Sequence, residues 1–388
     1  MRVLFLNPFH GGSHRAFAEG WVRRSRHEIT LVTMPARFWK WRMRGAALHF
    51  VRKVENPAAY DALVVTDLMS LSDLKALWGV DCPPALAYFH ENQLSYPLPP
   101  GEAIDYQFGF TDVTTGLAAA RVLFNSRFQH DAFFGSLPGF IRMMPEYNPA
   151  WVVEAIRARA GVLHPGCEFP AGPPDLRPPD AAAPPAGVAP PPGGAPLVIW
   201  NHRWEFDKDP PAFFAALDAV LARGVEFRLA LLGENFQVVP KEFIAARERY
   251  GPRVVQYGWV ETRADYLDWL RRGRVVVSTA IQENFGMSIV EAIRMGCHPL
   301  LPNRLSYPEI LPREFHAHGL YAGPEDLVER LAALLAPGTA ATAKTADALR
   351  RRLAEAMGVY AWDSVVAAFD AEIEAIARVR GGQSGSSP

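Results

Sequence analysis

The sequence predicts two doubly wound α/β domains, which are Rossmann-like folds, joined by a proline-rich linker. In both halves of the 388-residue chain, short apolar runs alternate with stretches long enough for helices. Continuous rather than alternating hydrophobicity is typical of parallel strands covered on both faces. Between the two sets lies "EFPAGPPDLRPPDAAAPPAGVAPPPGGAP", whose composition supports neither a helix nor a central strand.

The first set of runs predicts an N-terminal domain over residues 1–166, followed by a linker over 167–196. Its strands are expected from runs rich in Val, Leu and Phe at residues 3–7, 28–33, 62–67, 85–90, 121–125 and 161–166.

The second set predicts a C-terminal domain over residues 197–380 and a disordered tail over 381–388. We expect strands at 196–201, 227–233, 253–258, 274–279 and 297–302, then amphipathic helices at about 323–336, 342–357 and 361–379. Two such domains are expected to leave a cleft between the carboxyl ends of their sheets, where open α/β sheets bind ligands.

Composition limits the possible functions. With 49% hydrophobic and 21% charged residues and a net charge of −1, the chain has the composition of a soluble globular protein, so nucleic-acid binding would need a local basic patch. Cys82, Cys167 and Cys297 are too few and too scattered for a disulfide framework or a metal knot, which favours a reducing cytoplasm. We see no signal-peptide core and no run near the roughly 20 apolar residues that span a bilayer.

Two glutamates mark the stretch "TAIQENFGMSIVEAIRMGCHPLLP", residues 279–302. Glu283 lies in the loop that enters a predicted helix and Glu291 about two turns along it, so both can face one ligand. A helix N-terminus favours an anion such as a diphosphate, and carboxylates accept hydrogen bonds from sugar hydroxyls. The alternative is that Glu283 caps the helix and Glu291 lies on the surface.

This stretch resembles the E-x7-E element of retaining glycosyltransferases with the GT-B fold, in which the first Glu contacts the donor sugar and the second the nucleotide ribose. The resemblance extends to "NHRWEFDKDP" (201–210), where relatives place an Arg and a Lys on the donor diphosphate, here Arg203 and Lys208. The alternative for this segment is a charged surface turn. The resemblance implies a donor site made of Arg203, Lys208, Glu283, Asn284, Phe285, Gly286, Met287 and Glu291.

A closer resemblance involves the N-terminal half. "NPFHGGSHRAFAEGW", "MPARFWKWRMRGAALHF", "AYFHENQLSYP" and "FNSRFQ" are similar to the family of tRNA-queuosine mannosyltransferases, and the similarity covers most of the chain apart from the linker and the tail. It implies transfer of mannose from GDP-mannose to the queuosine base in the anticodon loop of a tRNA. The first domain would then be the acceptor side, and the donor would be a substrate, with no cofactor.

Several N-terminal residues are candidates for the same site. Gly11 and Gly12 follow the first strand, where glycines allow the backbone to approach a ligand, although "HGGSH" is not the dinucleotide fingerprint. His90 ends the fourth strand and can hydrogen-bond a hydroxyl near the transferred sugar, or else serve the structure. Asn92 and Gln93 follow it on the acceptor side. Asn125 and Ser126 close the fifth strand, and a helix N-cap is an equal alternative for Ser126.

The segment "ARFWKWRMRGAALHFVRK" (36–53) mixes cations with aromatic residues, as do proteins that bind phosphates and stack on unpaired bases. Its aromatic residues could instead pack inward, or the helix could lie on an anionic membrane. The resemblance favours RNA, with the expected contacts Arg37, Lys40, Trp41, Arg42 and Arg44.

The mechanism expected from the resemblance is retaining transfer without a bound metal, because no cluster has metal-ligand spacing and no Asp-x-Asp motif is evident. His90 and Glu283 are the catalytic candidates, and the departing phosphate is expected to take the acceptor proton. The alternatives are a GT-B mannosyltransferase acting on a lipid or polysaccharide at a membrane surface, and a non-catalytic RNA-binding protein on the same scaffold.

Overall fold

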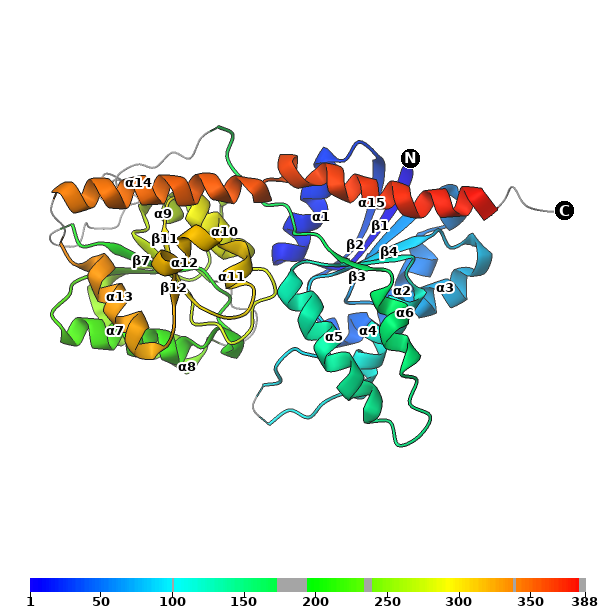
Figure 1. Cartoon of the computed structure of the whole chain (residues 1–388), viewed down its shortest axis with the longest axis horizontal. Coiled ribbons are helices and arrows are strands. Elements are labelled where there is room, and N and C mark those ends of the chain that lie inside the picture. Colours follow the sequence, from blue (N-terminus) through cyan, green and yellow to red (C-terminus); the bar gives the residue numbers. More distant parts are fainter. Residues whose placement is uncertain (100, 173–193, 234–238, 338–339, 384–388) are drawn as a thin grey trace. The chain divides into compact units, whose positions relative to one another are not determined.

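The computed structural model describes residues 1–99, 101–172, 194–233, 239–337 and 340–383, which divide into two compact units (Figure 1). Unit 1 consists of Met1–Glu168 and Tyr360–Pro388, and unit 2 of Phe169–Val359. Each unit holds one six-stranded parallel sheet, so the prediction of two doubly wound α/β domains is confirmed. Most of the predicted linker, 173–193, and the last five residues of the predicted tail lie outside the described residues.

The sheet of unit 1 has the strand order β2-β1-β3-β4-β5-β6. Its strands begin and end close to the predicted runs: β1 (Arg2–His10), β2 (Glu28–Pro35), β3 (Ala62–Thr66), β4 (Ala85–Phe89), β5 (Arg121–Phe124) and β6 (Ala160–Val162). The helices are α1 (Gly12–Arg24), α2 (Trp39–Lys53), α3 (Leu71–Trp78), α4 (Tyr106–Ala118), α5 (Arg127–Arg142), α6 (Trp151–Arg157) and α15 (Trp362–Gln383).

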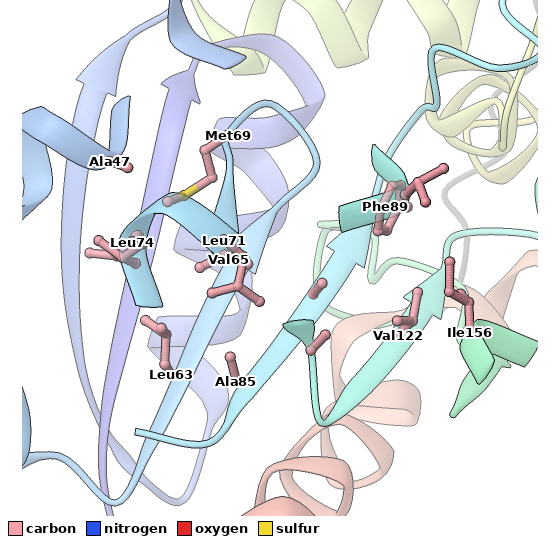
Figure 2. Close-up of a cluster of buried hydrophobic side chains, with 14 of the residues drawn as sticks. Ala47, Leu63, Val65, Met69, Leu71, Leu74, Ala85, Phe89, Val122 and Ile156 are labelled. Atoms are coloured by element: carbon pink, nitrogen blue, oxygen red, sulfur yellow. The ribbon is translucent and has the colours of Figure 1, made fainter. Parts of the chain in front are cut away.

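Both faces of this sheet are buried, which explains why the strands read as continuous apolar runs. Successive side chains of a strand point to opposite faces, so Leu4 and Leu6 enter one cluster while Val3 and Phe5 enter the other. Figure 2 shows part of the first cluster, where Leu63 and Val65 of β3 lie near Leu71 and Leu74 of α3. This face is covered by α2 to α6.

The opposite face is covered by α1 and by α15, the last helix of the chain. Trp362, Phe369 and Ile373 of α15 pack in one cluster with Phe17 and Trp21 of α1. The C-terminal boundary predicted at residue 380 is therefore wrong, because α15 belongs to unit 1. The amphipathic pattern predicted the helix but carried no information about which of two similar sheets its apolar face covers. Residues 381–383 also continue this helix instead of beginning a disordered tail.

The sheet of unit 2 has the strand order β12-β11-β10-β7-β8-β9. Its strands are β7 (Leu197–Trp200), β8 (Arg228–Leu231), β9 (Val254–Tyr257), β10 (Val275–Val277), β11 (His298–Pro302) and β12 (Leu320–Tyr321). The helices are α7 (Pro210–Ala222), α8 (Lys241–Tyr250), α9 (Arg263–Arg272), α10 (Met287–Arg294), α11 (Tyr307–Ile310), α12 (His316–Gly319), α13 (Pro324–Leu335) and α14 (Ala340–Ala356). Among the described strands of unit 2, the two-residue edge strand β12 is the one that the sequence pattern did not predict.

Strand order also determines where unit 2 can bind a ligand. From β7 the chain runs outward through β8 and β9, then returns to β10 on the other side of β7. The loops that leave β7 and β10 therefore diverge to opposite faces, and a crevice is expected at the carboxyl ends of these two strands.

Candidate active site

The candidate donor site lies at the carboxyl ends of β7 and β10. Asn201 and His202 follow β7, Ser278 and Thr279 follow β10, and all four are buried although they are polar. Thr279 Oγ1 donates to the carbonyl oxygens of Lys208 and Asp209 at 2.9 Å each. The loop after β7 is thereby tied to the loop after β10, so the predicted motifs 201–210 and 279–302 meet at one place.

Lys208 is the centre of this site. It ends a short 3-10 helix (Phe206–Lys208), is buried, and its Nζ donates to the carbonyl oxygen of Gln282 at 2.6 Å. Nζ also lies 3.4 Å from Glu283 Oε2 and 3.2 Å from Asp207 Oδ2. Burial alone would lower the pKa of the Lys208 ammonium, but the carboxylates of Glu283 and Asp207 outweigh it and hold the pKa above its usual value. The charged surface turn considered for this segment does not fit a buried, paired lysine.

Helix α10 begins at Met287, shortly after Glu283 in the sequence. Its N-cap is Gly286, with φ of 92°, in the left-handed region that favours glycine. In the part of the chain that the structure describes, no side chain caps the helix, and its first turn holds no acidic residue, so the backbone N–H groups there can receive an anion. Phe285 is buried and Met287 half-buried, while Asn284 Oδ1 accepts a hydrogen bond of 2.9 Å from Gln282 Nε2. Glu283 is therefore not the helix cap.

Glu291 is buried on the second turn of α10, which excludes the surface position considered for it. Its Oε1 lies 2.5 Å from Arg263 Nη2, and Tyr266 hydrogen-bonds the same carboxylate. Asn201 Nδ2 donates to the Tyr266 hydroxyl at 3.1 Å and to the Ser288 carbonyl oxygen at 2.7 Å. This network connects β7, α9 and α10 around Glu291. Sequence reasoning missed Arg263 and Tyr266, which carry no local motif.

Arg203 lies at the rim of the site. Its side chain is 44% exposed and its Nη2 lies 3.2 Å from Glu205 Oε2. Its positive charge is close enough to act on Lys208 and on the imidazole of His202. The geometry therefore brings together the predicted cations Arg203 and Lys208 with the predicted carboxylate Glu283.

His202, between Asn201 and Arg203, was also missed. Burial, followed by the charge of Lys208, lowers the pKa of its imidazole to about 3, so the ring is neutral near pH 7. Its Nδ1 lies 3.9 Å from Glu283 Oε2, and its Nε2 has no hydrogen-bond partner within the described residues. A neutral, buried donor or acceptor beside Glu283 is suited to a hydroxyl or phosphate oxygen.

In unit 1, Gly11 and Gly12 stand where β1 passes into α1. Gly11 is the N-cap of the helix, and a Cβ there would lie 2.4 Å from the Cβ of Ala36. Gly12 has φ of 50° and open space around its missing side chain. The structure thus gives Gly11 a packing role, whereas Gly12 retains the predicted freedom of the backbone to approach a ligand.

His90 follows β4 and is buried against His14, with ring centroids 4.2 Å apart. Burial, and then the neighbouring His14, holds the pKa of His90 well below its ordinary value. Its Nε2 has no partner within the described residues, and its backbone N–H donates to Asp67 Oδ1 at 2.9 Å. Asn125 Nδ2 donates to the His90 carbonyl oxygen at 2.8 Å, while Ser126 caps α5, the alternative that the sequence left open.

Asn92 and Gln93, predicted to face the acceptor, also hold the loop after β4 in shape. Asn92 Oδ1 accepts from the backbone N–H groups of Leu94 and Ser95, at 3.1 and 3.0 Å. The backbone N–H of Gln93 donates to Asp112 Oδ2 at 2.6 Å. Asp112, which sequence reasoning did not single out, is buried, and burial raises the pKa of its carboxyl group.

The segment 36–53, in which cations are mixed with aromatic residues, forms α2 and the turn before it. Its aromatic residues differ in burial: Phe50 is buried in the core, the ring of Trp39 packs on that of Phe108 with centroids 5.2 Å apart, and Trp41 is exposed. The predicted cations differ in the same way. Arg37, Lys40 and Arg44 are exposed, but Arg42 is partly buried and its Nη2 donates to the Pro35 carbonyl oxygen at 3.4 Å. Arg42 therefore has a structural contact that the prediction did not include.

Two family profiles match the chain, one within each of the two units. A family profile described as "tRNA-queuosine alpha-mannosyltransferase N-terminal" matches residues 2–167, and one described as "Glycosyl transferases group 1" matches residues 196–337. A Drosophila melanogaster protein named tRNA-queuosine alpha-mannosyltransferase is 34% identical over 314 residues, covering 80% of this chain and 82% of that protein.

Solved structures with low sequence identity share the fold. Sucrose-phosphate synthase from Thermosynechococcus elongatus superposes with a TM-score of 0.69 at 14% identity, covering 100% of both chains. HepE from Anabaena, in complex with UDP and glucose, gives 0.63 at 15% identity, covering 97% of this chain and 100% of that one. The predicted GT-B architecture is therefore confirmed.

Within the described residues, no helix is both long and apolar enough to cross a membrane.

Proposed function

Because this chain belongs to the tRNA-queuosine alpha-mannosyltransferase family and is therefore a hexosyltransferase, we propose that it transfers mannose from GDP-mannose to the queuosine base of a tRNA anticodon loop. We further propose that the configuration at the anomeric carbon is retained. The observation that carries the proposal is the meeting of Lys208, Glu283 and the open N-terminus of α10 at the carboxyl ends of β7 and β10.

The donor diphosphate would bind where positive charge converges. Lys208 supplies a buried ammonium, Arg203 an exposed guanidinium at the rim, and the first turn of α10 its backbone N–H groups. Glu291, fixed by Arg263 and Tyr266, would accept hydrogen bonds from the ribose hydroxyls. Glu283 would accept hydrogen bonds from the hydroxyls of the sugar that is transferred.

In the reaction, the acceptor hydroxyl attacks the anomeric carbon from the face that the diphosphate leaves. The bond between that carbon and the phosphate oxygen breaks, the glycosidic bond forms, and the proton of the acceptor passes to the departing phosphate. Lys208, Arg203 and the α10 amides act on the negative charge that develops on the leaving group. His90, neutral and with no partner for its Nε2 among the described residues, is suited to hold a hydroxyl of the sugar or the acceptor.

The experiment incubates the protein with GDP-mannose or UDP-glucose, using tRNA that carries queuosine and the same tRNA without it. Nucleosides are then analysed by mass, and the linkage is tested by digestion with α- and β-mannosidase. We expect one added hexose only with GDP-mannose and queuosine tRNA, released by the α-enzyme alone. Equal transfer from UDP-glucose, or to tRNA without queuosine, would contradict the proposed donor or acceptor.

Arg203 allows the donor site to be tested with a matched control. We expect Arg203→Ala to reduce kcat/KM for the donor about 10- to 100-fold, since a hydrogen bond to a charged group is worth about 1.5–3 kcal/mol. Arg223 is 43% exposed and, like Arg203, pairs with a glutamate, so Arg223→Ala removes a similar surface ion pair away from the site. If both variants keep wild-type kinetics, the diphosphate does not bind at Arg203.

A further inference from the structure

We propose that Phe38, Trp41 and Tyr106 form an aromatic platform on unit 1 on which unpaired bases of the RNA acceptor stack, with Arg37 and Arg44 binding the adjacent phosphates. This inference rests on the proposed function and deepens it, because it assigns the surface that would hold the tRNA. The three aromatic residues are called the platform below.

The platform side chains are unusually exposed for their size. Trp41 is 77%, Phe38 69% and Tyr106 51% exposed. Large aromatic rings contribute most to stability when they are buried, and several of them exposed together mark a binding surface. Rings that present a free face are the groups on which nucleic-acid bases stack without regard to sequence.

Two separate segments bring the platform together. Phe38 and Trp41 stand at the start of α2, and Tyr106 is the first residue of α4. Lys40 Nζ lies 3.1 Å from Glu102 Oε2, and the ring of Trp39 packs on that of Phe108. These contacts hold the start of α2, with Phe38 and Trp41, against residues 102–108, the stretch that contains Tyr106, whose ring centroid lies 6.4 Å from that of Phe140.

Phe38 occupies a backbone position that disfavours it. Its φ and ψ are 56° and 48°, the left-handed region in which glycine is the usual residue and a bulky side chain is uncommon. Burial of the ring does not offset this backbone strain, since the ring is exposed. Strained residues of this kind concentrate at sites where a ligand uses the side chain.

Cations stand beside these rings. Arg37 precedes Phe38, and Arg44, one turn beyond Trp41, is anchored by a hydrogen bond of 3.1 Å from its Nη1 to Thr111 Oγ1. Because the whole protein has a net charge of −1, neutralisation of phosphates depends on such a local group. Charge and stacking together suit single-stranded RNA.

The buried face of α2 argues against a membrane as the occupant. A helix that lies on a bilayer needs a continuous apolar face free to insert. The apolar face of α2 consists of Met43, Ala46, Ala47 and Phe50, all buried. Ala46, Ala47 and Phe50 belong to the first core cluster of unit 1, and Figure 2 shows Ala47 in it. The exposed aromatic residues alternate with cations and form no such face.

The test uses the full chain with Phe38→Gly and Trp41→Ala, and with Trp151→Ala as the matched control. Trp151 is a 64% exposed tryptophan that likewise begins a helix of unit 1, α6. Binding is measured by fluorescence anisotropy with labelled tRNA and by co-sedimentation with anionic phosphatidylserine vesicles. We expect each platform variant to bind tRNA about tenfold or more weakly, with GDP affinity unchanged and the control like wild type.

Stability and salt dependence separate the proposal from a structural effect. Glycine suits the backbone of residue 38, so Phe38→Gly should keep or raise the melting temperature while losing RNA affinity. Arg37→Ala with Arg44→Ala should lower the slope of log affinity against log salt by about 2. Wild-type tRNA binding by both folded platform variants would overturn the proposal, and so would a loss of vesicle binding in place of tRNA binding.

The two proposals fail in different ways. If wild-type protein binds tRNA through the platform but adds no mannose to it, the proposed function fails and the platform stands. If mannose transfer to queuosine tRNA is normal in Phe38→Gly and Trp41→Ala at limiting tRNA, the proposed function stands and the platform fails.

Discussion

Single residues of the candidate donor site are distinguished by the partners that hold them. Glu283, on a loop before the helix, has its Oε2 3.4 Å from the ammonium of Lys208 and 3.9 Å from Nδ1 of the neutral His202 imidazole. Glu291 lies within the helix and is paired with Arg263. A carboxylate near the reacting sugar can act on the transition state, whereas one near the ribose acts equally on the bound substrate and the transition state.

The first prediction compares the two glutamates. We expect Glu283→Gln to lower kcat at least tenfold, because in the proposed complex the transferred sugar would lose a charged acceptor beside its reacting carbon. Glu291→Gln should mainly raise the KM for the donor, because in the proposed complex it would weaken a ribose contact that persists throughout the reaction. Steady-state kinetics with varied GDP-mannose measures both. An unchanged kcat for Glu283→Gln would remove that residue from the reacting sugar.

A second prediction at this scale uses His298 of β11, a buried histidine away from the candidate site. Burial lowers the pKa of His298 to about 4, and its Nε2 lies 3.0 Å from the His318 carbonyl oxygen. The unfolded chain has an ordinary histidine pKa near 6.5, so it binds more protons than the folded chain between about pH 4 and 6.5. The contribution of His298 therefore destabilises the fold as pH falls through this window.

Replacing His298 by Gln should flatten that dependence. Across the window the lost linkage is on the order of 3 kcal/mol in the free energy of unfolding. Urea unfolding from pH 4.5 to 7 measures it. Parallel curves for His298→Gln and wild type would contradict the prediction.

At the scale of elements, helix α1 shows how a glycine can be required by packing. A Cβ at Gly20 would lie 2.0 Å from Nε1 of Trp362 in α15. Glycine within a helix usually costs about 1 kcal/mol relative to alanine, so its presence mid-helix needs a reason. The close approach of α15 supplies that reason.

Opposite signs are therefore expected for two Gly→Ala changes. Gly20→Ala should lower the free energy of unfolding by roughly 1–3 kcal/mol, because Trp362 must move. Gly135→Ala in α5, where a Cβ would meet no atom of the described residues within 4 Å, should raise it by up to about 1 kcal/mol. Denaturant unfolding of both variants checks the signs. Stabilisation by Gly20→Ala would show that α15 does not pack tightly on α1.

The elements differ in how well the sequence predicts them. Strands such as β1 and β10 were predicted because their side chains are buried on both faces and leave a continuous apolar run. The edge strand β12 has two residues, too few for any pattern. Glu283, Glu291 and Lys208 were found because they stand in local motifs. Arg263 was not, since it reaches Glu291 from a different helix, 28 residues away.

For the whole molecule, the main difference from the prediction is that unit 1 is built from both ends of the chain. Its sheet comes from the first 168 residues, but one face is completed by α15. Polar contacts reinforce this: Trp21 Nε1 donates to Asp370 Oδ1 at 3.1 Å, and Arg121 forms two bonds with Glu372, at 2.8 and 2.9 Å. Unit 2 has its own core, made of residues between 198 and 335.

The final prediction removes residues 360–388 from the chain. Trp362, Phe369, Ile373 and Ile376 would be lost from the core of unit 1, and burial of such side chains is worth about 1.5–3 kcal/mol each. The total approaches the roughly 5–15 kcal/mol that stabilises a whole domain, so unit 1 should not fold. We expect limited proteolysis to degrade residues 1–168 rapidly while GDP binding by unit 2 persists in calorimetry.

Phe369→Ala, a milder change, should destabilise unit 1 by about 3–5 kcal/mol with GDP affinity unaltered. Because α15 belongs to unit 1 and the described core cluster of unit 2 holds residues between 198 and 335, loss of GDP binding in Phe369→Ala would contradict the independence of the two units. Protease resistance of residues 1–168 in the truncated chain would contradict the role of α15.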